Sequence, residues 1–193
     1  MRKEKQVRLA EKRSVFEALV AEHEAALLRY VARILHDADL AQDVVQNALV
    51  KLFRRWRDVV KPGVNIGNWL YRVAHNEAVD CIRKRQRRQL LHFKQGVERQ
   101  TLEHREHNPL FRENHAREKV QAALEALDMR ERQVVLLKIY EEKSYREISD
   151  ITGLSSGNVG YILHHAIKKM AARLSDAEKQ AKDIEYHEKQ SET

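Results

Sequence analysis

The chain has 193 residues, enough for one domain or two small ones, and its formal net charge of +7 favours a polyanionic partner: DNA, RNA or an acidic membrane surface. No apolar run approaches the roughly 20 residues that a membrane span requires, and the N-terminal residues lack the apolar core of a signal peptide. The lone cysteine, Cys81, excludes an internal disulfide, so we expect a cytoplasmic protein that does not insert into a membrane.

Helical periodicity dominates a sequence with only 6 glycines and 2 prolines, so it predicts an all-α protein. After a basic extension of residues 1–13, the first helix is expected from about Ser14 to Leu35, with Ser14 and Glu17 forming a capping box. The second is expected from Leu40 to Val59. Its predicted inward-facing residues are Val44, Val45, Ala48, Leu49, Leu52, Phe53 and Trp56.

The third predicted helix, from Asn65 to Arg88, is the most informative element and closes an N-terminal domain of residues 14–88. One stripe is apolar: Ile66, Leu70, Val73, Ala74 and Cys81. The opposite stripe carries Arg72, Asn76, Arg83 and Arg87. Cations suit phosphates, and amide groups suit unstacked bases. Taken alone, this helix is explained equally well as a solvated basic surface.

Beyond Arg88 the periodicity decays, and residues 89–115 are predicted to form a linker. Gly96 and Asn108-Pro109 interrupt this segment, which could span on the order of 90 Å if fully extended. A second helical domain is expected over residues 116–174, followed by a charged tail of residues 175–193. Within that domain, a helix over residues 129–140, with Asp128 as its expected N-cap, is expected to bury Val134, Val135, Leu137 and Ile139.

The segment from Ser144 to Lys169 has the spacing of a helix-turn-helix. Ser144 and Glu147 can form a capping box, Gly153 suits the turn, and apolar positions can hold the two helices together. The second helix then presents polar side chains that can meet base edges and phosphates in a major groove. These are Ser156, Asn158, Tyr161, His164, His165 and Lys168. The alternative is a helical hairpin that serves only as scaffold.

Residues 41–47, AQDVVQN, contain an acidic-apolar-apolar-Gln motif, and residues 69–76, WLYRVAHN, read Trp-Leu-Tyr-Arg-apolar-Ala-x-Asn. Both motifs resemble those of region 2 of the extracytoplasmic-function (ECF) sigma factors of the sigma-70 family. Residues 124–174 resemble sigma region 4. The resemblance implies two small helical domains joined by a flexible linker. It also implies a protein that binds RNA polymerase core, recognises promoter DNA with both domains and promotes strand opening.

The resemblance further implies roles for individual residues. The second helix would dock on a coiled coil of the polymerase's largest subunit through Asp43, Gln46, Asn47, Arg54 and Arg55, and the polymerase flap is a further contact of the family. The loop before the third helix would capture a flipped base of the melted strand, with Asn65 as the polar contact. The downstream element and melted strand would be bound by Lys61, Asn65, Asn68, Arg72, Asn76, Arg83, Lys84 and Arg87. The helix-turn-helix would read the upstream element, and an anti-sigma factor is a candidate partner.

Some positions depart from the family pattern. Gln42 and Asn47 stand where acidic residues are usual, and the triplet Gly160-Tyr161-Ile162 stands where many relatives carry Lys, Ser and Arg. The reading helix therefore has fewer cations early in its length. Ser149 takes a usual core position and is expected to bond back to the preceding turn of backbone.

An enzyme, a cofactor and a metal site are not expected. The sequence lacks a Gly-rich phosphate loop, a paired metal-ligand motif and a Ser/His/Asp arrangement at useful spacing. His104 and His107 lie in the linker, and the adjacent His164 and His165 point apart on a helix. The serious alternative function is a helix-turn-helix regulator that acts without polymerase. Asp43 and Gln46 discriminate between the two, because only a sigma factor needs that face to bind core enzyme.

Overall fold

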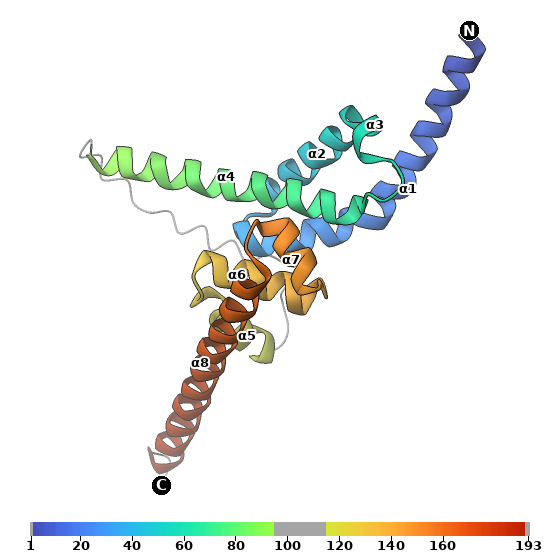
Figure 1. Cartoon of the computed structure of the whole chain (residues 1–193). Helices are drawn as coiled ribbons and strands as arrows, with labels where there is room; N and C mark the ends of the chain where they lie inside the picture. The colour runs from blue at the N-terminus through green and yellow to red at the C-terminus, as the bar shows by residue number, and fades with distance from the viewer. Residues whose placement is uncertain (1, 95–114, 192–193) are drawn as a thin grey trace. The chain divides into compact units, whose positions relative to one another are not determined.

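The structure is a computed structural model that describes residues 2–94 and 115–191. All regular elements in these two ranges are helical, which confirms the all-α prediction. The chain forms two compact units, one built from α1 to α4 and the other from most residues of α5 to α8 (Figure 1). Residues 95–114, which hold most of the predicted linker with His104 and His107, lie outside the described residues.

In the N-terminal unit, α1, α2 and α4 pack against one another around a core to which each contributes apolar residues. Asp37 caps α2, because its Oδ1 accepts the amide hydrogen of Leu40 at 3.0 Å. An ion pair between Lys51 and Glu77 joins α2 to α4. The helices of this unit are α1 (Arg2–Leu35), α2 (Ala38–Arg54), α3 (Trp56–Val59) and α4 (Ile66–Lys94).

The predicted start of the first helix at Ser14 is wrong, because α1 begins at Arg2. No glycine or proline precedes Ser14, and straight-chain residues such as Lys, Arg, Glu and Gln propagate a helix well. Ser14 therefore lies inside the helix, and Glu17 pairs with Arg13 at 2.8 Å rather than closing a capping box. At the other end of this unit, α4 continues through the first residues of the predicted linker, to Lys94.

The buried stripe predicted for α2 is confirmed at Val44, Val45, Ala48, Leu49 and Leu52. Phe53 is an error in that prediction, since it is 39% exposed. At about 100° per residue, Phe53 lies at the edge of the buried arc, so helical periodicity alone could not decide its environment. The helix predicted to Val59 is also divided, because α2 ends at Arg54 and the short α3 follows.

The C-terminal unit contains α5 (His115–Glu125), α6 (Met129–Val135), a π-helical turn (Leu136–Tyr140), α7 (Tyr145–Thr152) and α8 (Ser156–Ser191). Both expected caps form. Asp128 and Glu131 make a reciprocal capping box at the start of α6, and Ser144 and Glu147 make one at the start of α7. Gly153, with φ of +76°, makes the turn before α8 in a conformation that other residues adopt at a cost.

The π-helical turn overturns one predicted core residue. The amide of Glu141 donates to the carbonyl of Leu136 at 3.2 Å, five residues back, so the register shifts by one residue relative to an α-helix. Ile139 is consequently 53% exposed, whereas Leu136 and Leu137 are buried. Ser149 also differs from expectation, because its hydroxyl donates forward to the carbonyl of Leu154 instead of bonding back.

Candidate nucleic-acid and protein interfaces

The side of α2 turned away from the core forms one continuous face. We call it the α2 outer face and define it by Asp43, Gln46, Asn47, Val50 and Arg54. At about 100° per residue these positions share one arc, and all five side chains are exposed. Val50, 45% exposed, was missed by the sequence analysis. An apolar residue surrounded by amide and charged groups matches the usual composition of protein-binding surfaces.

The α2 outer face ends where the backbone leaves the helix. Arg55 has φ of −97° and ψ of 24°, and its amide donates to the carbonyl of Lys51 at 2.9 Å. Its own carbonyl accepts the amide hydrogen of Val59 at 3.1 Å, which starts α3. Arg54 and Arg55 are both exposed, so two adjacent guanidinium groups occur at this bend.

The loop between α3 and α4 begins α4 with a side-chain cap. Asn65 Oδ1 accepts the amide hydrogen of Asn68 at 2.8 Å, which gives Asn65 a structural role that the sequence analysis did not foresee. The cap uses the carboxamide oxygen and leaves the carboxamide nitrogen as a donor on an exposed residue. Gly63, with φ of +83°, turns the loop, and Lys61 is exposed beside it.

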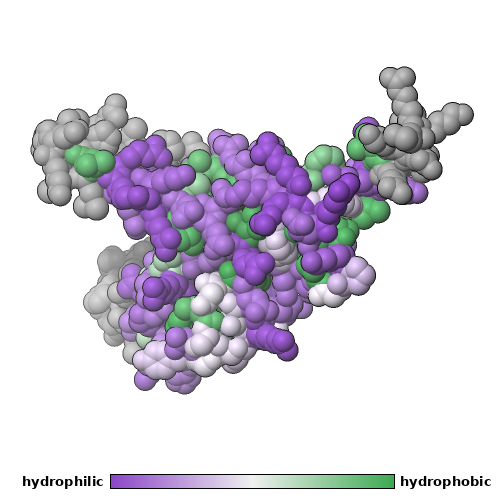
Figure 2. Space-filling model, turned by 45° about the horizontal axis from the view of Figure 1, so that its top comes forward, coloured by the Kyte–Doolittle hydropathy of each residue, from purple (hydrophilic) through white to green (hydrophobic). Residues whose placement is uncertain are grey.

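An exposed stripe follows from that loop along α4. We define the α4 stripe as Asn65, Arg72, Asn76, Arg83 and Arg87, which fall within a narrow arc of the helix opposite the buried Leu70, Ala74 and Ala78. In the view of Figure 2 the surface is mostly hydrophilic, with apolar groups in separate spots. The stripe offers three guanidinium groups and two amides over several turns, which is an arrangement suited to a nucleic-acid strand.

Two further predicted contacts of this set lie off the stripe. Lys84 is exposed but about 100° around the helix from Arg83. Asn68 is half-buried, and its Oδ1 is buried with no hydrogen-bond partner in the part of the chain that the structure describes. The structure therefore brings five of the eight predicted residues onto the stripe, places Lys61 in the loop, and makes Asn68 the least accessible of the set.

An acidic residue interrupts the α4 stripe. Asp80 is exposed and lies near the same arc, and its Oδ1 is 3.6 Å from Nη1 of Arg83. The sequence shows this acid three residues before Arg83, a spacing at which helical side chains meet. Because the pair is exposed, water screens it strongly, and Arg83 remains available to an anionic partner.

On α8 the predicted reading residues share one exposed side. Asn158, Tyr161, His164, His165 and Lys168 are all exposed, and the buried Val159, Leu163 and Ala166 lie on the opposite side. The rings of Tyr161 and His165 have centroids 4.2 Å apart. Ser156 is exposed in the first turn, apart from that side, and the preceding Ser155 caps the helix by accepting the amide hydrogen of Asn158 at 3.3 Å.

An ion pair holds α8 within its own unit. Lys169 Nζ donates to Oε1 of the buried Glu131 at 2.6 Å, and this hydrogen bond raises the pKa of Lys169. A Cβ at Gly160 would lie 3.4 Å from Cε2 of Tyr145, an ordinary contact distance, so nothing in the structure explains this departure from the family pattern. Lys169 thus secures the helix, whereas Lys168 faces outward.

Comparison with known proteins matches one family model to each of the two units. The Sigma-70 region 2 model matches residues 19–88, and the Sigma-70 region 4 model matches residues 117–170, together well over half of the chain. The chain belongs to the sigma-70 family. Its relatives place it among the ECF RNA polymerase sigma factors.

The relatives match across both regions. The chain is 28% identical over 178 residues to an RNA polymerase sigma-E factor of Streptomyces coelicolor, covering 91% of this chain and 94% of that one. It is 27% identical to the ECF RNA polymerase sigma factor SigL of Mycobacterium tuberculosis, covering 84% and 90%. A match that spans both units does not favour the alternative of a regulator that acts without polymerase.

Two proteins of solved structure share the fold. One is RpoE of Bartonella quintana, solved in complex with the anti-sigma factor NepR, with a TM-score of 0.67, 22% identity and coverage of 83% of this chain and 96% of that one. The other is CnrH, solved in complex with the cytosolic domain of CnrY, with a TM-score of 0.62, 24% identity and coverage of 85% and 90%.

The core of the region 2 unit contains a polar pair that the sequence analysis missed. His75 Nδ1 and the hydroxyl of Tyr30 lie 2.9 Å apart, and both side chains are buried. Burial lowers the pKa of His75 to about 4, so the imidazole is neutral near pH 7. His75 falls at the unspecified position of the tryptophan-containing signature and at the edge of the buried arc of α4, so the sequence carried no clear signal for its burial.

The described residues, 2–94 and 115–191, hold no group of three or more side chains arranged to bind a metal ion. None of the helices in those same ranges combines the length and apolar character of a membrane span.

Proposed function

We propose that this ECF sigma factor uses three separate surfaces. The α2 outer face, with Arg55, binds the coiled coil of the polymerase's largest subunit. The loop before α4 and the α4 stripe bind the melted strand at the downstream promoter element, and the exposed side of α8 binds the upstream element as duplex. The protein is a non-catalytic initiation factor that acts in the cytoplasm.

The α4 stripe is the observation that carries this proposal. Three guanidinium groups and two amides lie along one side of a helix whose other side is core, and the stripe starts at an exposed Asn65 beside a tight loop. Cations can follow the phosphates of a single strand while the loop accepts a base that has left the stack. Extruding a base costs a few kcal/mol, which binding to the stripe offsets.

The cap made by Asn65 determines how its role is tested. Replacing Asn65 with Ala removes both the cap and the base contact, whereas Asn65→Ser keeps a capping oxygen and removes the carboxamide nitrogen. We expect both variants, with core enzyme, to reduce permanganate-detected strand opening more than binding of duplex promoter DNA. Equal losses of opening and duplex binding in Asn65→Ser would contradict the base contact.

The contact with polymerase is tested at the centre of the α2 outer face. Asp43→Lys reverses a charge on an exposed residue and touches no core side chain, so the fold should persist. We expect it to weaken co-purification with core enzyme while leaving the affinity of α8 for upstream duplex unchanged. Asp176→Lys, at an exposed position of α8 outside the proposed contacts, is a control for the change of net charge.

An anti-sigma factor is part of this proposal. The sigma factor RpoE, which has the same fold, was solved in complex with an anti-sigma factor, and the α2 outer face with its exposed Val50 offers a protein-binding surface that an inhibitor could cover. Competition between a candidate anti-sigma protein and core enzyme for the purified chain tests this part.

A further inference from the structure

Lys12, in the N-terminal part of α1, contacts the end of α2. Its Nζ donates to the carbonyl oxygen of Phe53 at 2.9 Å and lies 3.6 Å from the centroid of the Phe53 ring. The same ammonium is 5.5 Å from the centroid of the Trp56 ring. Lys12 precedes residues 19–88, the segment that matches the region 2 model, so one partner of this contact lies outside that segment.

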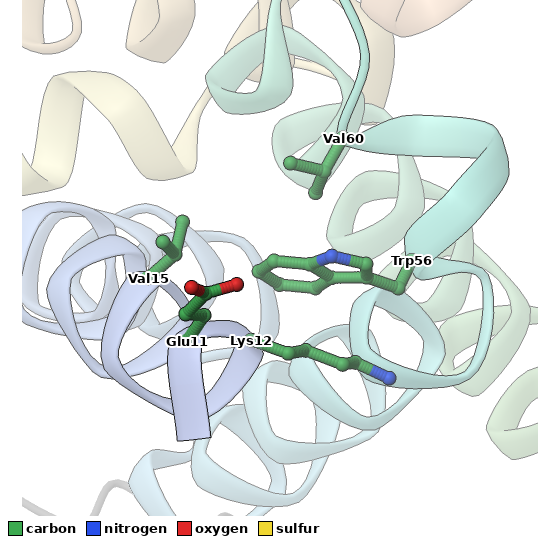
Figure 3. Close-up of a pocket in the computed structure, with 5 residues that line it drawn as sticks. All are labelled: Glu11, Lys12, Val15, Trp56 and Val60. Carbon is green, nitrogen blue, oxygen red and sulfur yellow. The ribbon is translucent and has the colours of Figure 1, made fainter. Parts of the chain in front are cut away.

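Aromatic packing fixes the place where Lys12 binds. Phe16, one turn after Lys12, packs edge-on against Phe53 with centroids 5.3 Å apart and lies 6.3 Å from Trp56. Figure 3 shows the stem of Lys12 running along the indole of Trp56, with Glu11 and Val15 near one end of the ring. These residues and Val60 line an open hollow of about 280 Å³, so the indole has room to move if the lysine is lost.

The carbonyl that Lys12 caps is in the last turn of α2. The final carbonyls of a helix lack donors within the helix and carry partial negative charge, and a cation at that end stabilises them. A cation close to an aromatic face is stabilised further by the ring's quadrupole. Lys12 therefore supplies a donor to the carbonyl of Phe53, the residue before Arg54. This hydrogen bond favours the bend at Arg55 over continuation of the helix into α3.

We infer that Lys12 is a positioning residue for the polymerase contact. It holds the bend that sets the directions of Arg54 and Arg55 at the end of the α2 outer face. This inference rests on the proposed docking of that face on the polymerase. It extends the functional part of the protein into the first half of α1, which the sequence analysis treated as a basic extension.

The substitutions are Lys12→Met, which keeps most of the stem and removes the ammonium, and Lys12→Arg, which restores a cationic donor. Arg13→Met is the matched control, because it removes an equal charge from the next residue of α1, where the side chain pairs along the helix with Glu17. With Trp69 replaced by Phe in every variant, Trp56 is the sole tryptophan. Its emission and its accessibility to acrylamide then report the bend directly.

We expect Lys12→Met to increase quenching of Trp56 and to weaken core binding about three- to tenfold, a loss that matches one cap and one cation–aromatic contact. Lys12→Arg should restore both values, and Arg13→Met should change neither. In an Arg54→Ala/Arg55→Ala background, Lys12→Met should cause no further loss of core affinity, because the groups that it positions are gone.

Unchanged Trp56 quenching in Lys12→Met would overturn the inference whether or not the chain binds polymerase. So would a loss of core affinity of the same size with and without Arg54 and Arg55, since that result indicates only general destabilisation. Failure of the wild-type chain to bind core enzyme would instead contradict the proposed function, and the fluorescence comparison would still decide whether Lys12 holds the bend.

Discussion

Acidification should destabilise the region 2 unit through His75. The imidazole is buried against the hydroxyl of Tyr30, and its pKa falls from 6.5 to about 4 because burial disfavours the charged form. Unfolding returns the pKa to its ordinary value, so this contribution to stability is complete above about pH 6.5 and declines as the pH falls toward 4. At 1.36 kcal/mol per pKa unit, the loss at pH 4 is roughly 3 kcal/mol.

A loss of that size is a large part of the 5–15 kcal/mol that stabilises a typical domain. The assay is urea unfolding followed by tryptophan fluorescence at pH 7, 5 and 4, since Trp56 and Trp69 both lie in the region 2 unit. The matched control is the double variant Tyr30→Phe/His75→Leu, which removes the titrating group and its partner together and so leaves no unpaired hydroxyl.

The wild type should lose roughly 3 kcal/mol more than the double variant between pH 7 and pH 4, because all other titrating groups are common to both. An NMR titration should show the His75 ring remaining neutral at pH 5. Identical pH dependence in the two proteins would refute the reasoning, as would an imidazole that titrates near 6.5 in the folded chain.

The remaining predictions concern single side chains. Asp80→Asn should raise affinity for single-stranded DNA and steepen its salt dependence, because an acid 3.6 Å from Arg83 is removed; a fluorescence anisotropy titration that shows no gain contradicts this. A Cβ at Gly67 would lie 3.2 Å from Cε1 of His23. The change in the free energy of unfolding caused by Gly67→Ala should therefore be more favourable by about 0.5–1 kcal/mol in a His23→Ala background than in the wild type. The same change in both backgrounds would exclude the contact. Gly153→Ala should cost about 1 kcal/mol from its φ of +76° alone, measured by circular dichroism during urea unfolding, and a neutral result would be inconsistent with that backbone.

The sequence predicted those parts of the fold that follow from local pattern. The buried stripe of α2, the cap of α6 by Asp128 and the turn at Gly153 all depend on residues within a few positions of one another. Local pattern also explains why the predicted contact residues are exposed, because a helix that buries its apolar side exposes the opposite side. Asn68, which is half-buried, is the partial exception.

The errors arose where distant residues or an irregular backbone decide the outcome. Phe53 lies at the edge of the apolar arc, and only the aromatic contacts with Phe16 and the ammonium of Lys12 reveal its environment. Ile139 was displaced by a π-helical turn, which has no clear sequence signature. His75 and Tyr30 are 45 residues apart, so their buried pair could not be read from either helix alone.

Asn65 shows how structure refines a predicted role without removing it. The resemblance assigned this residue to a base contact, and the structure gives its oxygen to the start of α4. Both roles are compatible, because the cap needs the oxygen and a base contact can use the nitrogen.

We propose that the α4 stripe binds a melted promoter strand after the α2 outer face has bound core enzyme. Run-off transcription and permanganate footprinting of the reconstituted holoenzyme separate these two roles, with Arg72→Ala/Asn76→Ala compared with the wild type and with Asp43→Lys. We expect the stripe variant to retain core binding but to fail to open the promoter, whereas Asp43→Lys should lose core binding. Normal promoter opening by the stripe variant would exclude the proposed role of the α4 stripe.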